Sequence, residues 1–271
     1  MIIVAMKVYI LVDTEGEACV VGHGPGGAKT GPWQFEYVRR RATAEATAAV
    51  EGAREGGATD IVVHDAGFLR GHSPGGLILH YDDLPRGIRI AQGVAPIRQV
   101  CDSSFDAAFL IGHHARFGVE DGVMSHTFSM VSLNHLHLNG REIGEIGIES
   151  LQIGAFGVPV VMVSGDEAGC REAKQWLGDI EVAPTKKGLA YHGAISLHPA
   201  DADDLIRKGA ARAIERTRAG EFKPLKIDPP YELQIETRGE EAAEMRVKRH
   251  HAERTGPCTV VKRTSDPLEL W

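Results

Sequence analysis

Short, continuous apolar runs recur along this chain, and each is followed by polar or Gly-rich residues. The clearest runs cover residues 8–12, 61–63, 107–111 and 158–163. Runs of this length without polar alternation are typical of strands buried on both faces, as in a parallel sheet. Amphipathic helices are predicted between them, over residues 33–55, 144–156 and 167–177. This alternation predicts an α/β fold with a mainly parallel sheet flanked by helices.

The pattern changes near residue 183. An amphipathic helix is predicted over residues 200–219, and a Pro-rich junction follows over 224–230. Residues 231–236 alternate like a half-exposed strand. We therefore expect two domains, an α/β domain over residues 1–183 and a smaller α+β C-terminal subdomain over residues 184–271.

Composition narrows the classes of function. The chain has 271 residues, 43% of them hydrophobic, and a formal net charge of −7. No basic face for nucleic acid is expected, and no apolar run reaches the roughly 18 residues that span a bilayer. The apolar N-terminus lacks the features of a signal peptide. The four Cys form no CxxC pair, which is typical of reduced thiols in a cytoplasmic protein.

Ionisable residues follow four of the predicted strands. They are Asp13 with Glu15, His64 with Asp65, His113 with His114, and Asp166. The carboxyl ends of parallel strands meet at one sheet edge, so these groups are expected to converge there. Carboxylates and imidazoles together are typical ligands of zinc, and a shared carboxylate can bridge two metal ions.

Several of these residues also have a plainer interpretation. Neighbours along a strand point in opposite directions, so only one of His113 and His114 is expected to face the site. Asp166 is expected to cap the following helix. His135 and His137 alternate with leucines and are expected at the surface or at an interface.

The motifs occur in an order that identifies a family. They are Val12-Asp13-Thr14-Glu15-Gly16, Gly112-His113-His114-Ala115-Arg116, Gly122-Val123-Met124-Ser125-His126, Ile143-Gly144-Glu145-Ile146-Gly147 and the segment 159–166. Together they resemble the zinc-dependent D-aminopeptidase family, peptidase family M55, from about residue 7 to residue 199.

The resemblance implies two zinc ions per chain and removal of N-terminal D-amino acids from short peptides. It implies that Asp13, Glu15, His114 and Glu145 are zinc ligands and that His126 has the direct catalytic role. It also implies a homo-oligomer, of which a decameric ring is the form known in the family.

One position departs from the family pattern. The family has a zinc-ligating His after the second strand, where this chain has Gly67. An insertion of about five residues in the loop would bring His72 to that place. His64, inside the strand end, is another option. The third option is that no residue replaces the ligand, which leaves one metal site in doubt.

The resulting hypothesis is metal-assisted amide hydrolysis. Asp13 bridges two metal ions, Glu15 and His72 complete one site, and His114 and Glu145 complete the other. The metals polarise the scissile carbonyl and lower the pKa of a bound water. His126 acts as nucleophile or as general acid/base, since its pKa of about 6.5 suits proton transfer near neutrality.

Three alternatives remain open. The first is a metallo-amidohydrolase or an L-aminopeptidase of altered specificity. The second is a non-catalytic relative that lacks one metal ligand. The third is nucleotide binding through the Gly-rich residues 22–30, although the Gly-Lys-Ser/Thr of a P-loop is broken there.

Overall fold

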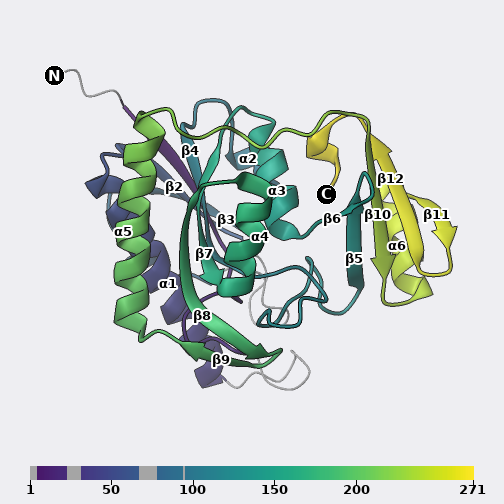
Figure 1. Ribbon diagram of the computed structural model, residues 1–271, viewed down its shortest axis with the longest axis horizontal. Helices are drawn as coiled ribbons and strands as arrows, with labels where there is room; N and C mark the ends of the chain where they lie inside the picture. Colours follow the sequence, from purple (N-terminus) through teal and green to yellow (C-terminus); the bar gives the residue numbers. More distant parts are fainter. Residues whose placement is uncertain (1–4, 23–31, 67–77, 94) are drawn as a thin grey trace.

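The computed structural model describes residues 5–22, 32–66, 78–93 and 95–271. Within these residues the chain forms two sheets, a larger one on the left of Figure 1 and a smaller one on the right. The predicted loop ligand His72 lies outside the described residues, as does the departing position Gly67.

The larger sheet has seven strands in the described part of the chain. Their order is β3 (Arg89–Gln92), β2 (Asp60–Asp65), β1 (Lys7–Val12), β4 (Ala107–His113), β7 (Val160–Asp166), β8 (Glu181–Ala190) and β9 (Gly193–Ser196). All neighbours pair in parallel except β8 and β9. The apolar runs of β1 and β4 are buried along almost their whole length, as strands covered on both faces require.

Helices cover both faces of this sheet. One face packs against α1 (Pro32–Glu55) and α5 (Pro199–Arg218), through alanines of α1 such as Ala46 and Ala49. The opposite face packs against α3 (Glu145–Gly154) and α4 (Glu167–Leu177), with the short α2 (Ile97–Val100) beside α3. The small side chains of α1 let it approach α5 closely, and the two helices stand together in Figure 1.

The smaller sheet is antiparallel in its described strands. Their order is β11 (Glu253–Gly256), β12 (Thr259–Thr264), β10 (Tyr231–Thr237), β5 (Leu133–Leu138) and β6 (Arg141–Glu142). Helix α6 (Glu240–His250) packs on it, and two short 3-10 helices, η1 (Tyr81–Asp83) and η2 (Pro267–Glu269), complete the elements. The alternating burial of β10 is that of a sheet with one covered face.

The predicted fold class is confirmed, and the pairing adds detail to the expected domains. The boundary predicted between residues 183 and 184 lies inside β8, and β5 and β6 join the second sheet from the middle of the chain. Strand β8 can add to β7 in parallel because α4 supplies the crossover between them. Strands β6, β8, β9 and β11 were not predicted.

Candidate metal centre

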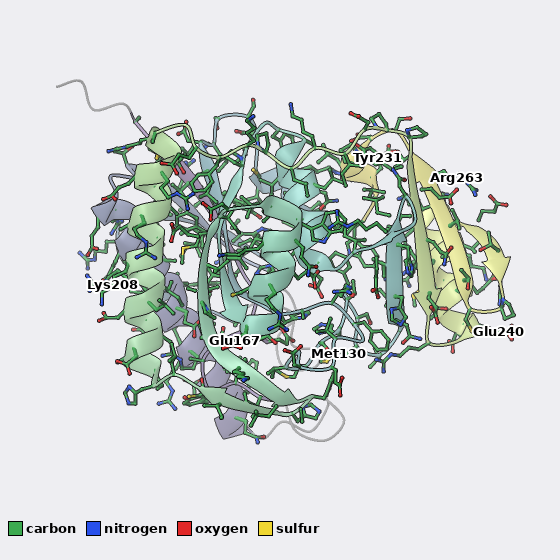
Figure 2. All side chains as sticks on the ribbon, viewed as in Figure 1. Met130, Glu167, Lys208, Tyr231, Glu240 and Arg263 are labelled. Atoms are coloured by element: carbon green, nitrogen blue, oxygen red, sulfur yellow. The ribbon has the colours of Figure 1, made fainter. Side chains whose placement is uncertain are left out.

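The carboxyl ends of the central strands meet at one edge of the larger sheet, as predicted. Strands β1, β2, β4 and β7 run in the same direction, so Asp13, His114 and Asp166 follow strand ends at the same edge. Figure 2 shows this edge at the lower side of the molecule, where Glu167 begins α4 and Met130 lies nearby. The segment between β4 and β5 crosses this edge and carries His126.

Two glycines lock the loop after β1 onto the end of β4. The N–H of Gly16 donates to the carbonyl of Gly112, with 2.7 Å between nitrogen and oxygen. A Cβ on Gly16 would stand 1.9 Å from the carbonyl oxygen of His113, and one on Gly112 would stand 2.3 Å from that of Asp13. Only glycine allows this approach. It brings Asp13 beside the residues that follow β4.

The conformation of Gly112 separates the two histidines that come after it. Its φ of 74° breaks the alternation of β4, and the pairing with β7 shifts register here. His113 turns toward α3, where its Nε2 lies 2.7 Å from Glu149 Oε2. His114 faces Asp13 instead. The prediction that only one of the pair faces the site is confirmed.

Two overlapping groups of ligand atoms form around His114. Ligand atoms of His114, His126 and Glu145 lie within 4.8 Å of one another, and those of Asp13, Glu15 and His114 do so as well. His114 Nε2 lies 3.3 Å from Glu145 Oε1 and 3.5 Å from Asp13 Oδ2. His126 Nε2 lies 3.6 Å from the same Glu145 oxygen. The structure thus brings together five of the six predicted site residues.

The backbone orients both imidazoles of this cluster. His114 Nδ1 lies 2.9 Å from the carbonyl oxygen of Ala115, and His126 Nδ1 lies 2.8 Å from that of Met124. A carbonyl only accepts, so each Nδ1 carries the hydrogen. In a neutral ring, Nε2 is then free to bind a metal or a proton. The two rings are stacked, with centroids 4.1 Å apart.

The donor atoms fit a divalent cation such as zinc. Asp13 Oδ2 and His114 Nε2 are buried, and neither has a hydrogen-bond partner among the described residues. When His114 is neutral, these are two buried acceptors that face each other without a partner, which is unfavourable. A cation between them would satisfy both, and carboxylate oxygen with imidazole nitrogen is a typical zinc donor set.

The buried carboxylates of the cluster also favour a positive charge between them. Burial and the Glu15 carboxylate raise the pKa of Asp13 well above its usual range. Burial opposes a charge on His114, but Glu145 and Asp13 outweigh it and raise the pKa of His114. Burial also opposes a charge on Glu145, yet His114 lowers the pKa of Glu145 to about 2. A divalent cation can replace the proton of His114 in this balance.

His126 sits in a backbone segment that is held in an unusual conformation. Met124 and Phe128, on either side of it, have φ values of 49° and 57°. The N–H of Met124 donates to the carbonyl of Tyr191 at 2.8 Å, and the N–H of Phe128 donates to Glu145 Oε1 at 2.5 Å. Burial and the neighbouring His114 lower the pKa of His126. Its ring is therefore neutral at pH 7 and aimed at Glu145.

Other predicted residues lie outside the cluster. Asp166 caps α4, as expected, by accepting from the N–H of Gly169 at 2.7 Å. His64 Nδ1 lies 2.7 Å from the hydroxyl of Tyr9, whose ring belongs to the hydrophobic core on the α3 side of the sheet. His135 and His137 lie half-buried on β5, and His135 is paired with Glu142 at 2.5 Å.

The sequence reasoning missed three groups that support the cluster. They are the N–H of Phe128, the buried carboxylate of Glu17 and the buried ammonium of Lys186. A third acid in Asp13-Thr14-Glu15-Gly16-Glu17 was a visible signal. The role of Lys186 had no such signal, because its partners lie far away in sequence.

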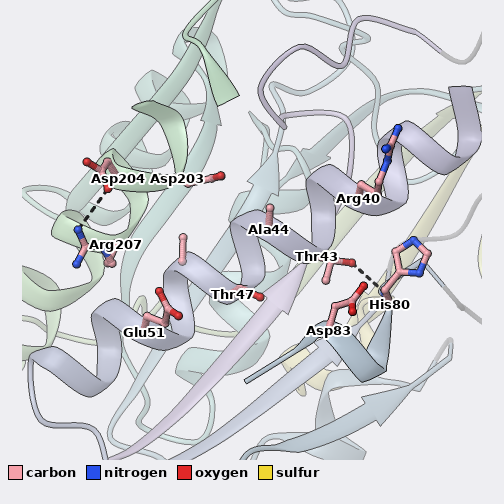
Figure 3. A pocket seen from close by; sticks show the side chains of 11 residues that line it. Arg40, Thr43, Ala44, Thr47, Glu51, His80, Asp83, Asp203, Asp204 and Arg207 are labelled. Carbon is pink, nitrogen blue, oxygen red and sulfur yellow. Dashed lines mark hydrogen bonds and ion pairs between the residues drawn. The ribbon is translucent and has the colours of Figure 1, made fainter. Parts of the chain in front are cut away.

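A separate cavity of about 370 Å³ lies between α1 and α5, on another part of the molecule. Figure 3 shows its polar lining, in which the Thr43 hydroxyl accepts from the N–H of His80 and Asp204 pairs with Arg207. None of the five clustered residues lines it. Among the described residues, neither candidate group of metal ligands lies in this cavity.

Comparison with known proteins identifies the family. The model of the family Peptidase_M55, described as D-aminopeptidase, matches residues 6–271. The chain belongs to this family. A D-aminopeptidase from Bacillus subtilis (strain 168) is 29% identical over 271 residues, covering 98% of this chain and 94% of that protein. The match covers nearly the whole chain, including the smaller sheet.

A solved M55 structure has the same fold. The Zn-dependent D-aminopeptidase DppA from Bacillus subtilis, described as a self-compartmentalizing protease, superposes with a TM-score of 0.85 and 28% identity. The match covers 97% of this chain and 93% of that one. In the described part of this chain, no helix is both long and apolar enough to cross a membrane.

Proposed function

We propose that this M55 chain removes an N-terminal D-amino acid from short peptides by amide hydrolysis at a two-zinc site. One observation carries the proposal: two groups of buried ligand atoms share His114 at the carboxyl edge of a parallel sheet. That edge is where open α/β sheets bind their ligands. Zinc, when bound, polarises the scissile carbonyl and activates water for attack.

Each residue of the cluster has a proposed task. His114 belongs to both groups, Asp13 and Glu15 to one of them, and Glu145 to the other. With zinc bound, Asp13 is proposed to serve both ions, Glu15 would complete one site, and His114 and Glu145 would complete the other. His72 is the proposed further ligand from the loop after β2. Phe128 holds Glu145 in place by donating its N–H to the carboxylate.

His126 is proposed to move the proton. Its Nδ1–H is occupied by Met124, so Nε2 is the atom that takes up or returns a proton. A lowered pKa keeps this nitrogen unprotonated at pH 7, which suits a general base. Because Nε2 also lies 3.6 Å from Glu145 Oε1, zinc ligation is the alternative role for His126.

The test compares the zinc-loaded protein with His126→Ala on a D-alanyl dipeptide and its L-isomer. We expect release of D-alanine, and a loss of at least about 100-fold in kcat for His126→Ala. His137 is a half-buried residue of β5 outside the cluster, so His137→Ala is the matched control and should keep full activity. Retained zinc in His126→Ala assigns proton transfer, and lost zinc assigns ligation. Full activity of the metal-free protein, or of His126→Ala, rejects the mechanism.

The proposal extends to self-assembly. The self-compartmentalizing description of the Bacillus subtilis relative supports it, since that protein matches this chain over nearly its whole length. We therefore propose that copies of this chain assemble into a closed homo-oligomer that admits only short peptides.

A further inference from the structure

Side chains of β8 hold the loop that carries Asp13 and Glu15. Four of its backbone carbonyls accept hydrogen bonds from two consecutive residues of that strand. Thr185 Oγ1 donates to the carbonyl of Gly16 at 2.7 Å. Lys186 Nζ donates to the carbonyls of Glu15 at 2.6 Å and Glu17 at 2.8 Å, and also to that of Val20.

These contacts use the full capacity of the ammonium group. A lysine has three N–H donors, and all three of Lys186 end on carbonyls of this one loop. The residue is only 2% exposed. Buried carbonyls outside helices and strands need donors from elsewhere, and a charged donor binds them more strongly than a neutral one. One side chain therefore anchors three carbonyls of the loop.

The charges around Lys186 explain how an ammonium can be buried here. Burial lowers the pKa of Lys186 to about 8, while the carboxylates of Asp166, Glu45 and Glu17 act in the opposite direction. Glu17 is fully buried, and neither of its carboxylate oxygens has a hydrogen-bond partner among the described residues. The lysine thus adds positive charge beneath a loop that is rich in acids.

We propose that Lys186 is a positioning residue for the zinc site, acting through the backbone of residues 15–20 to set the carboxylates of Asp13 and Glu15. This inference rests on the proposed zinc site. Lys186 belongs to neither group of candidate ligands, and its Nζ bonds backbone carbonyls of the loop. The link runs through Glu15: its carbonyl accepts from Lys186, and its carboxylate joins Asp13 and His114 in one group of candidate ligands.

The experiment measures zinc affinity rather than activity. Lys186→Met keeps the length of the side chain and removes its charge and donors. Its zinc dissociation constant, from competition with a chromophoric chelator, should be about 10–100-fold weaker than that of the unmodified protein. Lys187→Met, at the exposed neighbouring position, is the matched control and should bind zinc normally.

A second readout separates positioning from general stability. All proteins are compared at a temperature where far-ultraviolet circular dichroism shows them folded. At saturating cobalt(II), the visible spectrum of Lys186→Met should differ from that of the unmodified protein, because the ligand geometry has changed. If Lys186 only stabilised the core, Lys186→Met would lower the unfolding midpoint but leave both the zinc affinity and the cobalt spectrum unchanged.

The outcomes distinguish this inference from the proposed function. If the unmodified protein binds no zinc, the proposed function fails and the inference fails with it. Unchanged zinc affinity and cobalt spectrum in folded Lys186→Met overturn the inference alone. If Lys186→Met does not fold, Thr185→Val is the second variant. It removes the Oγ1 contacts to the carbonyls of Gly16 and Gly165 but leaves Lys186 in place, and it should weaken zinc binding in the same direction by a smaller factor. Normal affinity in Thr185→Val would then overturn the inference.

Discussion

At the scale of single residues, close approach of backbone segments builds the site. The loop after β1 and the end of β4 touch at Gly16 and Gly112, where no side chain fits. The left-handed conformation of Gly112 then sends His113 and His114 to opposite sides. The positions of the candidate ligands thus depend on two glycines that have no side chain to bind a metal.

Replacement of Gly112 by alanine should be unusually destabilising. The alanine would have to adopt a φ near 74°, and its Cβ would clash with the carbonyl of Asp13. We expect a loss of about 3 kcal/mol or more in the free energy of unfolding. Gly140→Ala is the matched control, because Gly140 has a φ of 80° with open space around it. Its loss should be about 1–2 kcal/mol. Equal losses in urea unfolding would contradict the role of the clash.

Strand patterns predicted the ligand types and the sheet edge, whereas the choice of His114 over His113 came only from the family resemblance. Alternation along a strand shows that one of His113 and His114 faces inward, and the φ of Gly112 decides which. That angle follows from tertiary contacts with Asp13 and is not a local property of the sequence. The same holds for Lys186, whose partners stand about 170 positions earlier.

At the scale of elements, Asp166 at the N-terminus of α4 connects this helix to the segment that carries His126. Asp166 Oδ1 accepts from Gly169 in the first turn, and Oδ2 accepts from the N–H of Val123, both at 2.7 Å. One buried carboxylate therefore caps a helix and fixes the backbone just before Met124. It does so without joining either group of ligand atoms.

Asp166→Ala should lower stability and leave zinc binding intact. Loss of the cap and of the Val123 contact should reduce the free energy of unfolding by about 1–3 kcal/mol. Asp166→Asn keeps one acceptor oxygen and should lose less. Urea unfolding together with zinc analysis checks both variants. Loss of zinc without loss of stability would instead indicate that Asp166 is a ligand.

The elements missed by sequence reasoning share a physical cause. Strand β8 carries Pro184, Lys186 and Lys187 and has no continuous apolar run. It is a strand because β7 offers a partner edge and the loop carbonyls accept from Lys186. Tertiary context of this kind overrides local β propensity. Strands β1, β4 and β7 carry their own signal in buried apolar side chains and were predicted.

At the scale of the whole molecule, the candidate ligands come from separate parts of the fold. Asp13 follows β1, His114 follows β4, Glu145 begins α3, and His126 lies in the segment that leads to the second sheet. A cation held by all of them binds the folded chain only. Its affinity is therefore added to the stability of the fold.

Removal of zinc should lower the thermal unfolding midpoint. At free zinc about 1,000 times its dissociation constant, the stabilisation is about 4 kcal/mol, or roughly 10 °C for a chain of this size. Differential scanning calorimetry with zinc and with chelator measures the difference. Asp13→Asn removes a charged candidate ligand and should shrink this shift. An undiminished shift in that variant would place the stabilising zinc elsewhere.

The pairing of β5 with β10 has a consequence for biosynthesis. Leu138 faces Leu233 across the two strands, so nearly a hundred residues must follow β5 before its partner exists. During translation β5 lacks that neighbour, although the contacts of the His126 segment with Glu145, Asp166 and Tyr191 involve residues made before β10. Long-range pairing of this kind is slow to form. The strand that ends the His126 segment therefore gains its long-range partner only after the ribosome has made β10.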